Sequence, residues 1–142
     1  MVDGRGVPLS IVVTGANVHD SKRLDQVLSD IVVKRPTPNL RRSKHLCADA
    51  GYYGAELRRT IERHGYIPHV VGRGQEAKAK RRDPRNKARR WIVEVCHSWF
   101  NRFRKLLVRY EKLDRSFIAL NHLAAAIIAF RKVRLIVNII YG

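Results

Sequence analysis

The spacing of apolar residues in the first third of the chain predicts a strand followed by a helix. The β-branched run at 7–14 predicts a strand, and the glycines on either side of Arg5 predict that it belongs to a hairpin. Apolar residues then recur at helical spacing from 24 to 32, and Asp20 or Ser21 is a suitable cap for the start of that helix.

A strand, a helix and a second strand are predicted next. The run at 45–49 has the length and composition of a short strand, and the helix that opens at Ala55 should end at Gly65, which suits a C-cap. Residues 66–72 predict another strand, in which Pro68 favours a strand start or an edge. Strands that alternate with helices indicate an α/β layer structure with some parallel pairing.

The C-terminal half is predicted to be helical. A long helix is expected from about Lys87 to Tyr110, and a last helix, which starts near Ser116, is apolar nearly all round and should be buried. The residues at 133–142 are apolar and β-branched, and no element is assigned to them. The apolar stripe of the long helix consists of Ile92, Cys96, Trp99, Phe103, Leu106 and Tyr110.

The charge balance narrows the class of partner. The chain carries 29 Lys and Arg against 12 Asp and Glu, a net charge of +17. Such an excess favours a polyanion, most often nucleic acid, and exceeds what solubility alone usually needs. An anionic membrane surface ranks lower, because the basic residues do not line one face of an amphipathic helix. Residues 73–90 hold nine Lys or Arg and two acids, so this segment is predicted to be solvated.

The cysteines and the N-terminus indicate a cytoplasmic protein. Cys47 and Cys96 form neither a disulfide framework nor a CxxC motif, and we expect both to be reduced and buried. The first ten residues do not resemble a signal peptide, and the apolar run at 123–130 is too short to span a bilayer.

Two carboxylates have the surroundings that metal-dependent cleavage of a phosphodiester needs. Asp49 follows a strand and opens a turn that contains Gly51, although a purely turn-forming aspartate has the same pattern. Glu94 is the only acid between Asp83 and Glu111, and it lies opposite the apolar stripe of its helix. A solvent-facing glutamate paired with Arg90 is the alternative there. Lys87, Arg90 and Asn101 share the face of Glu94.

Several motifs together resemble one family. In chain order they are VDGRGVPLSIVVTGANVHDSKRL, CADAGYYG, GYIPHVVGR, RRWIVEVCHSWFNRFRKLLVRYEK and ALNHLAAAIIAFR. These motifs resemble the C-terminal half of a DDE transposase of the insertion-sequence-five type. The resemblance implies that residues 1–132 are the C-terminal part of a catalytic domain, with 133–142 as an apolar tail of uncertain structure.

The resemblance implies a ribonuclease-H-like mixed sheet with flanking helices and three acids, which would hold two Mg²⁺ ions about 3.5–4 Å apart. Asp49 matches the second Asp of the family and Glu94 matches its Glu. The first Asp would lie on a strand upstream of Met1, so the chain is expected to be a truncated element or a frameshift product. Asp3 lies in the hairpin and does not replace that acid.

The same resemblance implies DNA as the partner, together with an upstream transposase segment or a homo-oligomer, and no membrane. The Arg-to-Glu spacing of related transposases is present in Arg90 and Glu94, whereas Lys87 and Asn101 stand where relatives have Tyr and Lys. A non-enzymatic basic nucleic-acid-binding protein and an inactive remnant remain alternatives. The expected DNA contacts are Lys78, Lys80, Arg81, Arg82, Arg85, Lys87, Arg89, Arg90, Asn101 and Arg102.

Overall fold

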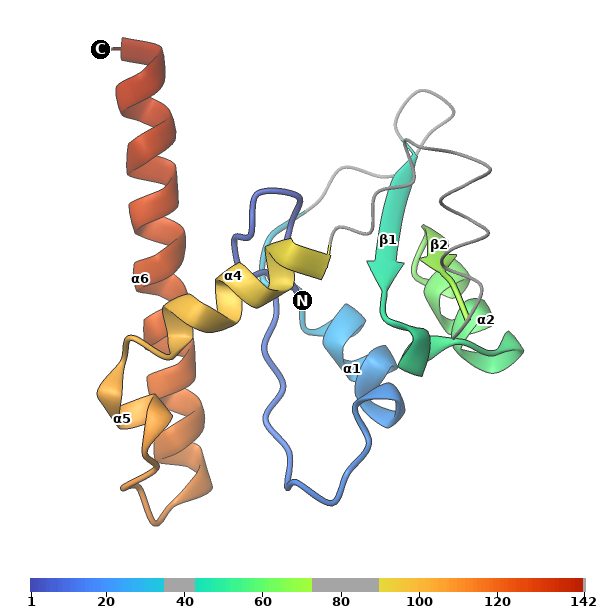
Figure 1. Cartoon of the computed structure of the whole chain (residues 1–142), viewed down its shortest axis with the longest axis horizontal. Coiled ribbons are helices and arrows are strands. Elements are labelled where there is room, and N and C mark those ends of the chain that lie inside the picture. The colour runs from blue at the N-terminus through green and yellow to red at the C-terminus, as the bar shows by residue number, and fades with distance from the viewer. Residues whose placement is uncertain (35–42, 73–89, 142) are drawn as a thin grey trace. The chain divides into compact units, whose positions relative to one another are not determined.

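The computed structural model describes residues 1–34, 43–72 and 90–141 (Figure 1). The chain divides into two compact units, one formed by residues 14–90 and the other by residues 1–13 and 91–142. The predicted basic segment at 73–90 lies outside the described residues, apart from the backbone of Arg90.

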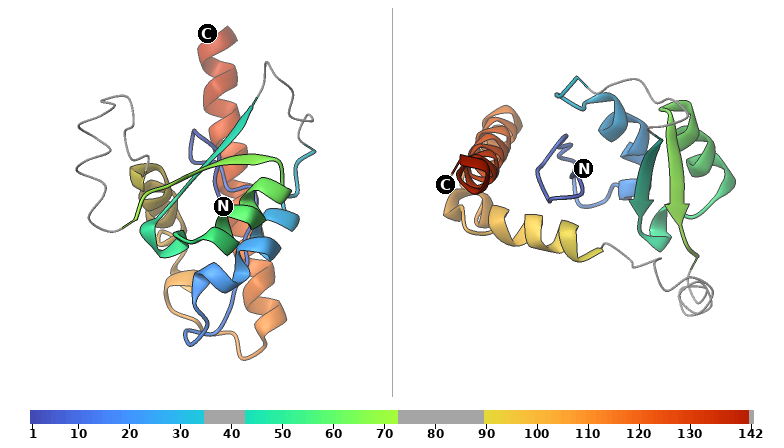
Figure 2. Two further views of the ribbon diagram at one scale, coloured as in Figure 1. Left: turned by 90° about the vertical axis from the view of Figure 1, so that its right-hand side faces the viewer. Right: turned by 90° about the horizontal axis from the view of Figure 1, so that it is seen from above.

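The unit of residues 14–90 contains a two-stranded parallel sheet. Strand β1 spans Lys44–Ala48 and strand β2 spans Tyr66–Val70, with Leu46 opposite Pro68 in the register. Figure 2 shows the two strands side by side. Both predicted strands and the parallel pairing are confirmed, and Pro68 lies in an edge strand of this sheet, as expected.

Helices precede and link these strands. A 3₁₀ helix, η1, spans Asp20–Arg23 and leads into α1, Leu24–Ser29, while η2, Ala50–Tyr52, and α2, Ala55–Arg63, connect β1 to β2. Helix α1 is shorter than predicted, because the apolar residues beyond it do not pack: Val32 is 75% exposed and Val33 is 53% exposed.

The structure corrects the predicted cap of the first helix. His19, rather than Asp20 or Ser21, is the N-cap of η1, and its Nδ1 accepts a hydrogen bond from the Ser21 amide at 3.3 Å. The imidazole reaches the amide two residues on, which leaves the Asp20 carboxylate in the first turn without a capping role.

The end of α2 has the predicted glycine. Gly65 adopts a φ of +75°, and its amide donates to the Glu62 carbonyl at 2.9 Å. Glycine enters this left-handed region without strain, so the predicted helix end at Gly65 is confirmed, with His64 as the C-cap residue and Gly65 directly after it. The core of this unit consists of Leu24, Leu28, Leu46, Thr60, Ile61 and Tyr66.

The N-terminal segment forms the predicted hairpin turn without the predicted strand. The described backbone at 7–14 has only an isolated antiparallel bridge between Val2 and Pro8. Proline has no amide to donate to a ladder, which limits pairing here. Asp3 Oδ1 instead closes the turn by accepting from the Arg5 amide at 2.8 Å and the Val7 amide at 2.9 Å.

The predicted long helix to Tyr110 is broken. Helix α4 spans Arg90–Phe100, and after a turn at 101–103 the short helix α5 spans Arg104–Leu107. The break occurs because Phe103 adopts an extended conformation, with φ −88° and ψ 97°. The stripe therefore buries Ile92 and Cys96 at its start, whereas Tyr110 at its end is 74% exposed.

The last helix, α6, spans Asp114–Tyr141 and so includes residues 133–141, for which no element was predicted. The prediction that it is buried all round is wrong. Ala124 and Ile128, one turn apart, are 2% and 5% exposed, but Leu123 and Phe130 are 57% and 67% exposed. Over residues 114–133, whose side chains the structure describes, the chain packs against one side of α6, so side chains such as Leu123, Phe130 and Val133 stay exposed.

One stretch of α6 has the length and composition of a membrane span. The apolar run at 123–130 belongs to a 20-residue stretch, Asp114–Val133, that is long and apolar enough to cross a membrane by these two criteria. Core helices of soluble proteins meet the same criteria, so length and composition do not distinguish a membrane span from a core helix here.

Replacement of Ile61 by Ala should destabilise the unit of residues 14–90. Ile61 is 0% exposed, so its truncation leaves a cavity and should cost about 2–5 kcal/mol in the free energy of unfolding, measured by urea denaturation. Ile67 on β2 is 46% exposed, and Ile67→Ala, the matched control, should cost about 1 kcal/mol or less. Equal losses in the two variants would contradict this assignment of the core.

Candidate active site

Asp49 lies at the point where β1 ends and the connection to β2 begins. Its Oδ1 accepts a hydrogen bond from the Ala50 amide at 2.6 Å, which makes Asp49 the N-cap of η2. The carboxylate is exposed at the carboxyl end of a parallel strand, where α/β proteins commonly bind ligands. Asp49 therefore has the turn-forming role that its sequence context allowed, in a position that also suits chemistry.

The turn after Asp49 lies close to the start of η1, which the sequence reasoning missed. A Cβ atom added to Gly51 would lie 3.9 Å from Cε1 of His19. Burial raises the pKa of Tyr52, and the negative charges of Asp20 and Asp49 raise that pKa further. A second acid and an imidazole thus belong to the surroundings of Asp49. The adjacent His19 and Asp20 were the available signal, but the sequence interpretation assigned only Asp20, as a possible helix cap.

Glu94 lies on α4 and points away from the core of its unit. Ile92 and Cys96 are 6% and 1% exposed, whereas Glu94 is exposed. The predicted placement of Glu94 opposite the apolar stripe is therefore confirmed. Trp91, at 62% exposed, is an apolar neighbour on the solvent side of the same helix.

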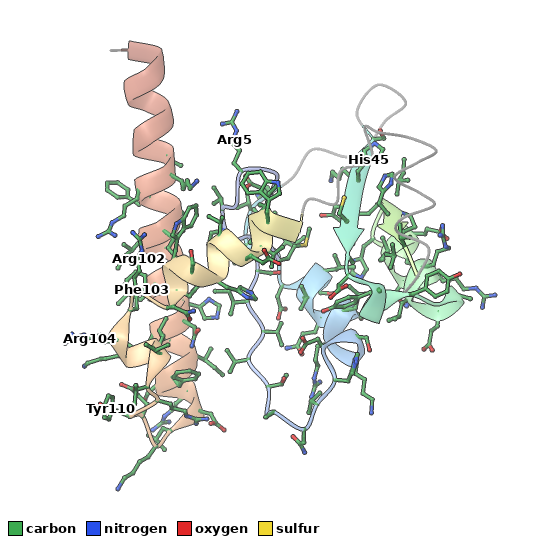
Figure 3. The ribbon with its side chains drawn as sticks, in the orientation of Figure 1. Arg5, His45, Arg102, Phe103, Arg104 and Tyr110 are labelled. Carbon is green, nitrogen blue, oxygen red and sulfur yellow. The ribbon has the colours of Figure 1, made fainter. Side chains whose placement is uncertain are left out.

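Two of the predicted DNA contacts follow α4 directly. Asn101 and Arg102 are exposed in the turn that separates α4 from α5. Figure 3 shows Arg102, Phe103 and Arg104 together at this junction. Arg90 is the first residue of α4. The other predicted contacts, which are Lys78, Lys80, Arg81, Arg82, Arg85, Lys87 and Arg89, lie outside the described residues.

The donor atoms of the two candidate acids fit a hard divalent cation, because carboxylate oxygens are the ligands that Mg²⁺ prefers. In the described parts of the chain, no group of three or more His, Cys, Asp or Glu side chains is close enough to hold a metal ion. Asp49 and Glu94 belong to different units, so their convergence on one cleft stays a prediction. These acids are suitable ligands, but two of them are not a complete site.

The two cysteines differ from each other, and the prediction for one is wrong. Cys96 is 1% exposed, and burial raises the pKa of its thiol. Cys47 is exposed, because its side chain lies on the outer face of β1 with that of His45. Both are free thiols.

Comparison with known proteins decides the family. The model of the transposase DDE domain family matches residues 46–131, a segment that includes both Asp49 and Glu94. The chain belongs to this family. The family as a whole is one of transposases and uses divalent metal ions.

A relative supports this assignment. The chain is 32% identical over 117 residues to the protein assigned as the transposase of insertion sequence element IS402 from Burkholderia cepacia. The match covers 79% of this chain and 52% of the relative, so the chain spans about half the length of the curated relative that it matches. No solved structure matches the chain.

Substitutions of Asp49 should separate its capping role from its charge. Asn is as good an N-cap as Asp, so Asp49→Asn should leave the thermal midpoint nearly unchanged. Asp49→Ala removes the acceptor of the Ala50 amide and should cost about 0.5–1 kcal/mol, the low end for a missing cap, because η2 is short. The measurement is thermal unfolding followed by circular dichroism. A large loss in the Asn variant would show that the charge itself stabilises the turn.

Proposed function

We propose that this chain supplies two of the three catalytic carboxylates of a transposase that cuts and joins DNA strands by phosphoryl transfer. The observation that carries the proposal is the family match at 46–131, which contains Asp49 at a strand end and Glu94 on an exposed helix face. Asp49 is proposed as the second acid of the DDE triad and Glu94 as the third. The first acid would come from a polypeptide segment equivalent to the part of the longer relative that this chain does not match.

A ribonuclease-H-like arrangement is the proposed fold of the complete catalytic domain. The parallel pairing of β1 with β2 and the helical connection between them support it. In that arrangement Asp49 and Glu94 would face each other across one cleft, with the family's first acid beside them. We propose that an upstream transposase segment supplies that acid; a homo-oligomer is the other proposed partner.

The two carboxylates have defined roles in this proposal. The hydrogen bond from the Ala50 amide to Asp49 Oδ1 holds that carboxylate in one orientation. Burial of Ile92 and Cys96 on the opposite face of α4 keeps Glu94 on the exposed face of that helix. Divalent ions, proposed to be Mg²⁺, would supply the positive charge that stabilises the attacking and leaving oxygens. Carboxylates that are already held in position reduce the structural rearrangement needed to reach the transition state.

The excess positive charge provides the proposed binding energy for DNA. Phosphate contacts from Lys and Arg fix the position of a duplex without reading its sequence. The segment at 78–90 would provide most of them, and Asn101 and Arg102 would add contacts beside the helix that carries Glu94. Because its proposed substrate is cellular DNA, the protein is proposed to act in the cytoplasm.

Removal of either carboxylate charge should abolish strand cleavage. Asp49→Asn and Glu94→Gln, each introduced with the upstream segment supplied in cis, should lower the rate of Mg²⁺-dependent DNA nicking by about 10²-fold or more. DNA affinity in a gel-shift assay should not fall, because neither residue contributes positive charge. The measurement is conversion of supercoiled plasmid to its nicked form.

Glu56→Gln is the matched control for this test. Glu56 is an exposed acid in the first turn of α2, and its substitution should leave nicking unchanged. If Asp49→Asn and Glu94→Gln nick DNA as fast as the Glu56→Gln variant, the catalytic assignment is wrong. DNA binding without any nicking by the unmodified protein would instead favour a non-enzymatic nucleic-acid-binding protein.

DNA binding should depend strongly on salt. Eight Lys and Arg side chains lie between residues 78 and 90. Changing all of them to Gln should weaken binding and flatten the slope of log K against log salt by about 0.9 for each DNA phosphate that the protein no longer neutralises. Fluorescence anisotropy of a labelled duplex over a salt series gives both quantities.

Arg58 and Arg59, both exposed on α2, provide the control for a general effect of charge. Their joint change to Gln should leave the slope close to that of the unmodified protein. An equal flattening in both variants would show that net charge, rather than the segment at 78–90, carries the binding.

A further inference from the structure

The outer face of the sheet carries a pair of histidines for which transposition chemistry gives no role. Figure 3 shows His45 near the start of β1, and His69 lies on the neighbouring strand β2. His45 Nδ1 and His69 Nε2 are 2.7 Å apart, and the ring centroids are 5.0 Å apart with an interplanar angle of 30°. Both side chains are exposed. The parallel register thus brings two imidazole nitrogens into direct contact at the surface.

We propose that His45 and His69 form a binding site for one divalent transition-metal ion of the Ni²⁺, Cu²⁺ and Zn²⁺ class, which would cross-link β1 to β2. This site is separate from the proposed carboxylate site and does not depend on the proposed function.

The nitrogens are within hydrogen-bond distance of each other, and a shared ion would need them only slightly farther apart. Two nitrogens bound at about 2.0–2.1 Å lie roughly 2.9 Å apart when they occupy neighbouring positions at a right angle, and about 3.3 Å apart at a tetrahedral angle. The observed 2.7 Å is close to the first value. An ion would replace the hydrogen bond between the two rings, and both exposed rings would have to rotate so that their nitrogens face it. The fit is best for ions that prefer right-angled coordination, which are Ni²⁺ and Cu²⁺.

The surroundings of the pair also suit metal binding. Ser43 Oγ lies 2.9 Å from His45 Nε2, so the nitrogen that would not bind the ion already has an oxygen partner. Histidines that bind metals nearly always have such a partner, which fixes the ring. Partial burial and then the neighbouring His45 ring lower the pKa of His69 from its usual range.

The remaining coordination positions would be filled by water. Cys47 lies opposite His69 in the register and on the same face of the sheet. However, in the described part of the chain no three His, Cys, Asp or Glu side chains are close enough to share an ion. Two imidazoles with water ligands form an open site of moderate affinity. Imidazole nitrogen selects against Mg²⁺, which prefers oxygen.

Metal titration of the unmodified chain tests the proposal. The protein should be prepared without a polyhistidine tag and titrated with NiCl₂ in a calorimeter near neutral pH, with Mg²⁺ in excess to occupy carboxylates. We expect one Ni²⁺ per chain. His45→Gln and His69→Gln should each weaken binding at least tenfold, and Ser43→Ala should weaken it by a smaller factor. His122→Ala, a change of an exposed histidine on α6, should bind as the unmodified chain does.

A second measurement needs no substitution and therefore does not depend on the folding of a variant. Paramagnetic Ni²⁺ broadens the NMR signals of nearby nuclei, so the ring signals of His45 and His69 should broaden at lower Ni²⁺ concentration than those of His122. The proposal is overturned if the unmodified chain binds no Ni²⁺, if the His45 and His69 variants bind it as tightly as the unmodified chain, or if other histidines broaden first.

Discussion

The parallel pairing of β1 with β2 is the constraint on which the candidate site depends. Parallel neighbours cannot be joined by a tight turn, so the chain must cross from the end of one strand to the start of the next. Here the crossing consists of η2 and α2, and α2 is fixed by the complete burial of Ile61 and by Gly65 at its end. Asp49 is the first residue of that crossing. Its position follows from sheet geometry, and its orientation follows from the cap that it provides to η2.

A close backbone approach organises the other unit. Gly6 has a φ of +82°, and a Cβ atom placed there would lie 3.6 Å from Ile92 Cγ2 and 3.7 Å from Trp99 Cη2. Lys132 joins α6 to the same region, because its Nζ lies 4.1 Å from the Trp99 ring centroid and donates to the Arg5 carbonyl at 3.3 Å. These contacts fix which side of α4 is buried, and Glu94 is exposed as a result.

The sequence predicted an element correctly where its local residue pattern and its packing in the fold favour the same structure. Strands β1 and β2 and the glycine at the end of α2 could be predicted because each has a short-range signal that packing then reinforces. The break after Phe100 and the one-sided burial of α6 could not, because they depend on which surfaces meet. The strand-end position of Asp49 and the exposed face of Glu94 were predictable. The approach of His19 to Gly51 was not, because no periodicity connects segments so far apart in the sequence.

The surface around β1 carries two kinds of candidate metal ligand, a carboxylate and a pair of imidazoles. The end of the strand presents the carboxylate of Asp49, whose hard oxygens suit Mg²⁺. The outer face presents the imidazoles of His45 and His69, whose nitrogens suit later transition metals. The two kinds of ligand lie close together on one strand and its immediate continuation, and their different preferences would direct different ions to them. DNA, the proposed substrate, adds a further constraint, because a polyanion is repelled by a carboxylate. The net charge of +17 would reduce that repulsion at long range, and the proposed divalent ions would reduce it at the acids themselves.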